Sequence, residues 1–349
     1  MQQSGRPHVA FEVHESTQVG AVRRAAVQLA ESLGFDEVAA GRVALVATEL
    51  GTNLVRHAQR GRLLLGTVAG DEGEPSVELL SLDHGPGLGN VSNCLTDGYS
   101  TGGTPGTGLG AVRRLSNEFD LYSAVPAGTV IMARVAAGGR PAGGGAPTAL
   151  PPPCAFTIGA VTLAAPGETV CGDAWAAVQD GPRAAVLVAD GLGHGPQAAE
   201  AAQAAVALFE TTPFGSPSAV LERAHQALRS TRGAAVAQAL LDADQGHLLF
   251  AGAGNIAGRL ISGVGDRSLV SQHGTVGLQI RRLQDTRYEW PAHALLVLHS
   301  DGIATRWDLS LAPGLLQHHP CVVAAWLLRD HLRGRDDATV VVLKRRGAA

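Results

Sequence analysis

The first third of the chain carries two kinds of hydrophobic pattern. Apolar residues recur at helical spacing in VRRAAVQLAESLG, which ends at Gly34, and again in EVAAGRVALVATELGTNLVRHA, for which Asp36 is the predicted N-cap. Apolar runs typical of strands follow as RLLLGTVA, SVELLSLD, DLYSAV and GTVIMARV, with one more helix near GAVRRLSNEF. Helices and hairpin-like strands in separate groups predict an α+β sandwich.

Strand patterns dominate the C-terminal region. Apolar and β-branched runs recur there as FTIGAVTLA, DAWAAVQD, RAAVLVAD, AVAQALLD, HLLFAGAG, ALLVLHSDG and ATVVVLK. Two predicted helices, GPQAAEAAQAAVALFE and SAVLERAHQALRS, interrupt these runs. This order predicts stacked antiparallel sheets flanked by helices, so the second domain is also α+β.

The two patterned regions are separated by a segment without periodicity, AAGGRPAGGGAPTALPPP. Glycine and proline at this density cannot bury enough apolar surface to order a chain, which is typical of a linker. The total of 349 residues also exceeds the ~250–300 residues at which a single core stops growing. We therefore predict a first domain over 1–135, a linker over 136–153 and a second domain over 154–349.

Composition excludes several functional classes. The net charge of −4 offers no basic surface for nucleic acid. No apolar run reaches the ~18 residues of a membrane span, and no apolar signal core begins the chain, so we expect a cytoplasmic protein without a membrane partner. The four cysteines have no metal-site spacing and are expected to be free thiols. Lys344 is the only lysine, which excludes a P-loop lysine.

A candidate nucleotide site begins on the second predicted helix. Glu49, Asn53 and His57 are spaced i, i+4, i+8 and form a polar column beside the apolar stripe. Such columns are most often solvated faces. Two glycine-rich stretches follow, however: DHGPGLG, which begins with Asp83 at a strand end, and TGGTPGTGLG, which runs into a helix. Backbone N–H groups at such a loop–helix junction can hold phosphate.

These motifs in this order, over about residues 10–135, resemble the GHKL ATP-binding fold in its compact bacterial form. The stretch DGYSTGGTPGTGLGAVRRLSNEFDLYS is most similar to the RsbT/RsbW-like serine kinases that regulate sigma factors and the stressosome. The resemblance implies an N-terminal GHKL-type α/β sandwich that uses ATP and Mg²⁺. It also implies a serine or threonine acceptor on a separate protein.

The resemblance assigns roles to individual positions. Asn53 would hold Mg²⁺ between the phosphates, and Glu49 would orient or deprotonate the attacking hydroxyl. Asp83 would accept from the adenine amino group, supported through water by Thr129. The residues between Asn90 and Thr107 would form the ATP lid, while His57 is assigned either a phosphate contact or a structural role. The glycines that would approach the nucleotide are Gly85, Gly87, Gly106, Gly108 and Gly110.

A second candidate site consists of aspartates that follow or precede apolar strands. They are Asp173 in CGDAW, Asp190 in VADGLGHG, Asp301 in LHSDG and the pair Asp336–Asp337 in RDDATVVVL. One such aspartate is most often a turn or cap residue. Several carboxylates at the edge of an apolar core cost free energy to bury unless a cation binds to them. Hard oxygen ligands suit Mg²⁺ or Mn²⁺.

From Phe156 to Leu343 the chain resembles the SpoIIE/RsbX branch of the protein phosphatase 2C family. The stretch GDAWAAVQDGPRAAVLVADGLGHGPQAAEAA is close to that branch's signature, and AGAGN, GTVGLQI and HSDGI follow in the family's order. The resemblance implies a phosphatase 2C-like αββα sandwich with two Mn²⁺ or Mg²⁺ ions. It further implies that water activated by the ions attacks phosphorus directly, without a covalent phosphoenzyme.

In that resemblance Asp190 would bridge both ions and the carbonyl of Gly191 would bind one of them. Asp173 would reach that same ion mainly through water, while Asp301 and Asp336 would hold the other. Asp337 is the alternative to Asp336 as the direct ligand, and the family alignment favours Asp336.

The chain departs from the larger phosphatases at two points. Gly172 stands where they often have an acidic residue, and no clear counterpart of their phosphate-binding arginine is present. Substrate binding would then depend largely on protein–protein contact. His194 would either donate a proton to the leaving group or support its neighbours.

Together the two resemblances predict a bifunctional partner-switching regulator. An ATP-dependent serine/threonine kinase domain would phosphorylate a STAS-domain protein, and a metal-dependent phosphatase domain would remove the phosphate. The alternative is a non-catalytic ATP-binding domain that docks a sigma factor or another partner, fused to an active phosphatase.

Overall fold

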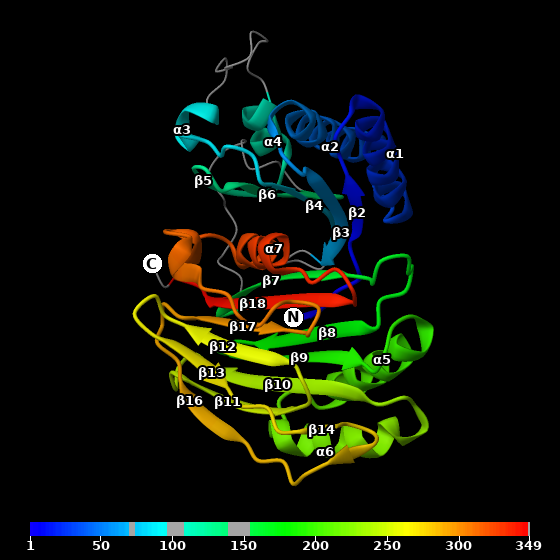
Figure 1. The fold of residues 1–349 in the computed structure, drawn as a ribbon, viewed down its shortest axis with the longest axis vertical. Helices are drawn as coiled ribbons and strands as arrows, with labels where there is room; N and C mark the ends of the chain where they lie inside the picture. Colours follow the sequence, from blue (N-terminus) through cyan, green and yellow to red (C-terminus); the bar gives the residue numbers. More distant parts are fainter. Residues whose placement is uncertain (70–73, 96–107, 139–153, 348–349) are drawn as a thin grey trace. The chain divides into compact units, whose positions relative to one another are not determined.

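The computed structural model describes residues 1–69, 74–95, 108–138 and 154–347. The chain divides into two units (Figure 1): one is His8–Leu150, and the other combines Met1–Pro7 with Pro151–Ala349. Both units mix helices with antiparallel sheets, so the predicted two-domain α+β fold is confirmed.

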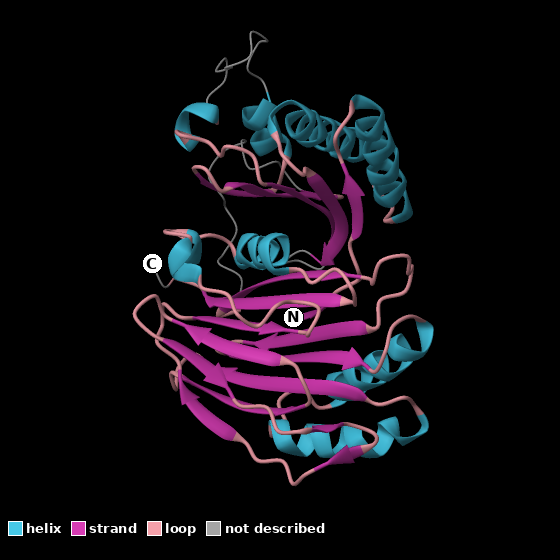
Figure 2. Cartoon of the chain, viewed as in Figure 1, coloured by secondary structure: helices cyan, strands magenta, loops and turns pink. Residues whose placement is uncertain are grey.

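The unit His8–Leu150 contains a five-stranded antiparallel sheet in the order β2-β3-β4-β6-β5. Helices pack against one face of this sheet (Figure 2), where their apolar side chains and those of the strands form one core. The elements are β2 (Val9–Glu12), α1 (Ser16–Ser32), α2 (Glu37–His57), β3 (Arg62–Ala69), β4 (Pro75–Asp83), α3 (Val91–Cys94), α4 (Gly108–Leu115), β5 (Glu118–Ala124) and β6 (Gly128–Ala136).

Helix α2 is the central helix of this unit. Its N-cap is Asp36, whose side chain accepts a hydrogen bond from Ala39 N at 2.7 Å, as the sequence predicts. The stripe that includes Val43, Val46 and Leu50 is completely buried in the core. Within the described ranges α2 is also the one helix long and apolar enough to cross a membrane by composition. Its buried stripe accounts for that composition, because a core helix has the same character.

The second unit stacks two sheets around a shared apolar core. Their strand orders are β1-β8-β9-β10-β11-β16 and β13-β12-β17-β18-β7. Helices α5 and α6 pack on the first sheet and α7 on the second, which confirms the predicted αββα sandwich. The helices are α5 (Pro196–Thr211), α6 (Pro217–Ala227) and α7 (Pro320–His331), with short 3₁₀ turns at Leu228–Ser230, Leu309–Leu311 and Leu315–Gln317.

Seven strands of this unit (β7, β8, β9, β10, β11, β17 and β18) coincide with the predicted apolar runs, and its other strands were not predicted. All its strands together are β1 (Gln2–Ser4), β7 (Phe156–Leu163), β8 (Asp173–Asp180), β9 (Arg183–Gly191), β10 (Ala234–Asp242), β11 (His247–Ala253), β12 (Ala257–Ile261), β13 (Asp266–Leu269), β14 (Gly274–Thr275), β15 (Gln279–Ile280), β16 (Thr286–Glu289), β17 (Leu295–His299) and β18 (Ala338–Arg345).

Several features differ from the sequence expectation. The short strands β2, β12, β13, β14, β15 and β16 were not predicted. Residues 1–7, expected in the first domain, belong to the second unit, because β1 adds to the edge of the sheet with Gln2 paired to Val178. Helix α7 was not predicted, because apolar residues fill nearly all of Cys321–Leu328 and leave no helical stripe. It packs closely on β7, where a side chain on Gly159 would meet Cys321 N at 2.0 Å.

The predicted linker falls mostly outside the described residues. Strand β6 continues to Ala136, and residues 139–153 are not among those described. The described cysteines are Cys94, Cys154, Cys171 and Cys321, and none of the four forms a disulfide, as expected.

Candidate active sites

Alternating strand direction brings residues from distant segments to one edge of the first sheet of the C-terminal unit. Strand β8 begins at Asp173, and the antiparallel strand β9 ends just after Asp190. The register pairs Asp173 directly with Asp190. Directly opposed residues project from the same face with their Cβ atoms about 4.5–5.5 Å apart. The two predicted ligands therefore lie side by side.

The second sheet brings the other aspartates to this site. Strand β17 ends at His299, just before Asp301, and β18 begins after Asp336–Asp337, with His299 paired to Val340. Ser300 joins the two sheets, because its hydroxyl donates to Asp173 Oδ2 at 2.6 Å and accepts from Thr339 N at 3.0 Å.

The electrostatics of this cluster are those of crowded carboxylates. Burial raises the pKa of Asp190 to about 9, with further contributions from the charges of Asp173, Asp301, Asp336 and Asp337. Burial likewise raises the pKa of Asp173 to about 7, although the hydrogen bond from Ser300 opposes this rise. Neighbouring negative charges with few compensating donors are costly unless a cation binds between them.

A cation at this site would be bound by some of these aspartates and would take its other ligands from backbone carbonyls and water. Asp173 Oδ1 is buried without a hydrogen-bond partner. Within the described ranges no group of three or more His, Cys, Asp or Glu side chains is arranged so that it could hold a metal ion, so further ligands would have to come from backbone and water. Gly191 would add its carbonyl, and a side chain at this position would meet Ala198 O at 2.0 Å, so helix α5 requires glycine here.

Asp336 and Asp337 occupy different environments. Asp337 is buried, and its Oδ1 accepts a hydrogen bond from Ala165 N at 2.8 Å. Asp336 is only half-buried and accepts a hydrogen bond from Asp337 N at 2.9 Å. Asp337 Oδ1 thus anchors the loop, while Asp337 Oδ2 is buried without a hydrogen-bond partner, as Asp173 Oδ1 is. The choice of Asp336 as the direct ligand stays a prediction.

The same geometry explains the unusual Gly172. A Cβ at this position would lie 2.7 Å from Asp337 Oδ2 and 2.8 Å from Ala198 Cβ. Both distances are shorter than ordinary van der Waals contact, so the acidic residue common in the larger phosphatases does not fit in this site.

Two further polar side chains lie in the loops that follow the sheet strands. Asn255, the last residue of the motif AGAGN, donates from Nδ2 to Asp301 Oδ2 at 2.7 Å. His194 pairs through Nδ1 with Glu168 Oε1 at 2.7 Å at an exposed position. The sequence analysis identified the AGAGN motif but did not predict that Asn255 contacts Asp301. It also did not predict the contacts of Ser300 with Asp173 and of Glu168 with His194.

The predicted nucleotide residues come together in the other unit. Glu49 and Asn53 lie one turn apart on α2 and face the first turn of α4. A Cβ on Gly108 would be 3.5 Å from Glu49 Oε2 and 3.6 Å from Asn53 Oδ1. Asn53 Nδ2 is buried without a hydrogen-bond partner. Buried amide groups normally have a hydrogen-bond partner, so this amide is expected to donate to a bound polar ligand.

The predicted adenine contacts also lie together. Asp83 ends β4 and is paired directly with Thr129 of β6. Asp83 Oδ1 accepts from Gly85 N at 2.7 Å. Ser123, which the sequence did not single out, contacts Thr129 Oγ1 at 2.9 Å and accepts a hydrogen bond from Leu88 N at 2.8 Å.

Two of the predicted glycines are required by close backbone approach. Gly85 lies against the end of α2, where a Cβ would be 2.7 Å from His57 O. Gly87 has φ +73°, and a Cβ there would be 2.4 Å from Ala124 O. Gly110 is buried within α4. Gly106 and most of the predicted ATP lid lie outside the described residues, which resume at Gly108.

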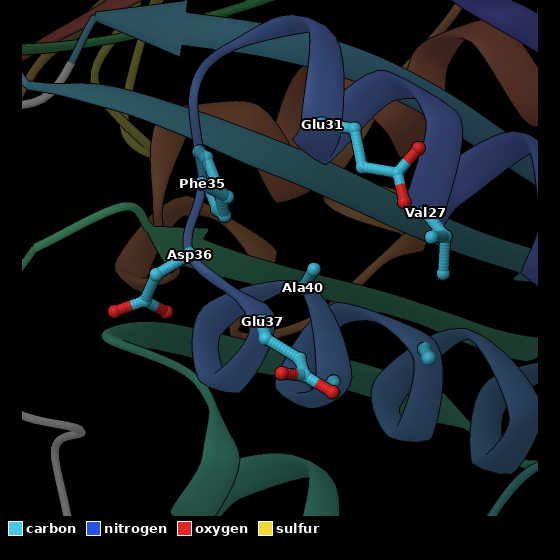
Figure 3. A pocket seen from close by; sticks show the side chains of 8 residues that line it. Val27, Glu31, Phe35, Asp36, Glu37 and Ala40 are labelled. Atoms are coloured by element: carbon cyan, nitrogen blue, oxygen red, sulfur yellow. The ribbon is translucent and has the colours of Figure 1, made fainter.

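Two surface hollows lie elsewhere on this unit. One, of about 370 Å³, is bordered by the end of α1 and the start of α2 (Figure 3) and lined by Glu31, Phe35 and Glu37. The other, of about 650 Å³, follows the exposed face of α2 from Glu37 to Thr48. Neither is lined by any predicted nucleotide residue, so we assign neither to ATP.

Comparison with known proteins identifies both units. The histidine kinase-like ATPase domain matches residues 13–135, and stage II sporulation protein E (SpoIIE) matches residues 180–346. The serine/threonine-protein kinase RsbT of Bacillus subtilis strain 168 is 35% identical over 113 residues, which are 32% of this chain and 84% of that kinase. The chain belongs to the RsbT family.

The SpoIIE-type unit has its own relatives. Phosphoserine phosphatase RsbX of Bacillus subtilis strain 168 is 30% identical over 90 residues, which are 26% of this chain and 45% of that phosphatase. The match thus spans less than half the length of RsbX. A solved chain of the bacterial stressosome is 29% identical with a TM-score of 0.51, over 54% of this chain and 99% of that one.

The solved RsbX in complex with magnesium is 21% identical with a TM-score of 0.50, over 54% of this chain and 95% of that one. At this identity the likeness shows the fold alone. The predicted combination of an RsbT-like ATPase domain and a SpoIIE-type phosphatase 2C domain is confirmed.

Proposed function

We propose that this RsbT-family chain adds phosphate to a serine or threonine of a STAS-domain protein and removes it again, using one domain for each reaction. The observation that carries the phosphatase half is the convergence of four aspartates from two sheets. Asp173 and Asp190 are directly paired, while Asp301 and Asp336 flank the ends of the adjacent strands β17 and β18.

In the phosphatase site, two Mn²⁺ or Mg²⁺ ions would supply Lewis-acid charge and an activated water. Asp190, at the centre of the carboxylates, is the proposed ligand shared by both ions. Asp301 and Asp336 would hold one ion. Asp173, oriented by the Ser300 hydroxyl at 2.6 Å, would hold the other mainly through water, together with the Gly191 carbonyl.

His194 lies four residues after Asp190 and is oriented by Glu168 at 2.7 Å. This pairing supports a role for His194 beside the leaving group, as a donor to the serine oxygen that departs. Because the pair is exposed, a substrate protein can reach it.

In the kinase site, Asn53 would bind Mg²⁺ and Glu49 would orient or deprotonate the acceptor hydroxyl. The short distances from both side chains to Gly108 support this proposal, since the missing side chain leaves room for phosphate at the start of α4. Asp83, paired with Thr129, would accept from adenine.

The proposed partner follows from the relatives. RsbT is a serine/threonine-protein kinase and RsbX a phosphoserine phosphatase, and the stressosome chain belongs to a modular signalling system. Joining both domains through the Gly/Pro-rich segment 136–153 would hold two opposing activities near one STAS-domain target at raised effective concentration. We place this switch in the cytoplasm, where ATP is available.

Labelled ATP tests both halves. We would incubate the full chain with γ-labelled ATP, Mg²⁺, Mn²⁺ and candidate STAS-domain proteins. Asp190→Asn should let labelled phosphoserine or phosphothreonine accumulate, because dephosphorylation is blocked. Adding wild-type chain should then release the label as phosphate.

Glu49→Gln in the Asp190→Asn background is the matched kinase variant. It should bind ATP and fail to label the STAS-domain protein. Equal labelling with and without Glu49 would refute the role of Glu49 while leaving the kinase activity in place. ATP binding without any labelling, with no effect of Glu49→Gln, would instead favour a docking role in which the first domain binds a sigma factor or another partner.

A further inference from the structure

The loop after Asp190 is joined to the segment before β10. Strand β9 ends at Gly191 and β10 begins at Ala234, and these two residues are paired. Leu192 N donates to Gly233 O at 3.0 Å, which extends the pairing beyond the strand ends. Arg232, which immediately precedes Gly233, is therefore carried to the same edge of the sheet as Asp190.

Thr231 fixes the backbone on both sides of Arg232. Its hydroxyl donates to Leu228 O at 2.8 Å and accepts from Gly233 N at 3.0 Å. Gly233 has φ +80°, a conformation that favours glycine. The turn is thus held by its own hydrogen bonds, while the Arg232 side chain is exposed.

The Arg232 guanidinium lies over the backbone of Gly193, three residues after Asp190. Nη1 is 3.2 Å from the position that a Cβ on Gly193 would occupy. Gly193 also has φ +85°. The absence of a side chain here lets the guanidinium approach the loop that leads away from the aspartate cluster.

Arg232 makes no hydrogen bond or ion pair with another residue that the structure describes. By contrast, Arg183 pairs with Asp180 at 3.1 Å and Arg259 with Asp266. An exposed guanidinium held over a glycine loop has its donors free. Its planar fork matches two oxygens of a phosphate monoester.

We propose that Arg232 binds the phosphoryl group of the substrate phosphoserine or phosphothreonine. Its guanidinium would neutralise phosphoryl oxygens beside Gly193, in addition to the positive charge that ions held by the aspartates would supply. This proposal rests on the proposed phosphatase function. Arg232, at the edge formed by β9 and β10, would then do the work of the phosphate-binding arginine of the larger phosphatases, for which the sequence alone showed no clear counterpart.

Inorganic phosphate, the product of the reaction, is the direct probe. Its dissociation constant would be measured by ³¹P NMR titration on the Mg²⁺-loaded full chain. Arg232→Ala should weaken phosphate binding about 10- to 100-fold, because a charged hydrogen-bonded pair is lost. Arg232→Lys should recover part of the loss, since an ammonium keeps the charge but not the fork.

Arg229→Ala is the matched control, because Arg229 is exposed three residues earlier in the same segment. It should bind phosphate like the wild type. Mg²⁺ binding in the absence of phosphate, measured as the rise in Tm on adding Mg²⁺, should be the same in all three variants as in the wild type. On a phosphoserine STAS-domain protein, Arg232→Ala should raise KM or lower kcat/KM by a similar factor.

Phosphate affinity that is the same in wild type and Arg232→Ala would overturn the proposal. Failure of the wild type to dephosphorylate any STAS-domain protein would count against the proposed function instead. In that case a loss of phosphate binding confined to the Arg232 variants would still establish the anion site.

Discussion

Asp173 and Asp190 face each other directly across the antiparallel strands β8 and β9. Two like charges in opposed positions destabilise a sheet. Their presence at this position is therefore difficult to explain by folding alone. A cation that both carboxylates help to bind provides the compensation, which makes this pair the centre of the proposed phosphatase site.

The metal-free chain should lose stability as pH rises. Asp190 has a pKa of about 9 in the folded chain against an ordinary value of 3.8, with burial as the main cause. The folded state therefore holds a proton that the unfolded state releases, and stability falls between about pH 4 and pH 9. Asp173, at about 7, acts in the same direction.

Thermal unfolding with a chelator, at pH values between about 5 and 9, would measure this loss. Asp190→Asn should flatten the decline, because the amide does not ionise. Mn²⁺ should raise the Tm of the wild type most at high pH and have little effect on the variant. A chelated wild type with the same pH profile as Asp190→Asn would contradict the assignment.

Ser300→Ala should weaken metal binding indirectly, because Ser300 orients Asp173 and is not itself a proposed ligand. The substitution removes the donor to Asp173 and the acceptor for Thr339 N, both buried. We expect a loss of about 1–3 kcal/mol in unfolding free energy and about 10- to 100-fold in metal affinity. Urea denaturation and Mn²⁺ titration would measure these, with exposed Ser310→Ala as the unaffected control.

Asn255→Ala should weaken binding of the ion that Asp301 is proposed to hold. The Asn255 amide orients Asp301 through a 2.7 Å hydrogen bond. We expect about a 10-fold loss of metal affinity, with little change in global stability because the site is partly exposed. Gln245→Ala, in the exposed turn between β10 and β11, is the control. Identical Mn²⁺ titrations for the two variants would refute this positioning role.

Ser123→Ala should weaken nucleotide binding in the first domain. The Ser123 hydroxyl accepts from Leu88 N and contacts Thr129, which is paired with Asp83. Loss of these neutral hydrogen bonds should raise the Kd for ATP about 3- to 10-fold. Calorimetry with Mg²⁺-ATP would test this, with Ser32→Ala at the end of α1 as the control. An unchanged Kd for ATP would show that Ser123 does not contribute to the proposed adenine site.

Local pattern was enough to predict most of the elements. The apolar runs before Asp83, Asp190 and Asp301 gave the strands β4, β9 and β17, since strand periodicity and a terminal polar residue are both local signals. The same logic failed for α7, whose run of apolar residues has no single period. It also failed for β1, whose place depends on the free edge of β8.

The sequence by itself determined which residues stand at strand ends and which backbone positions lack a side chain. Only the tertiary structure decided that Asp173 pairs with Asp190, that Ser300 connects the sheets, and that Arg232 lies over Gly193. The physical reason is that periodicity depends on neighbours along the chain. Register and sheet stacking depend instead on contacts between segments far apart in sequence.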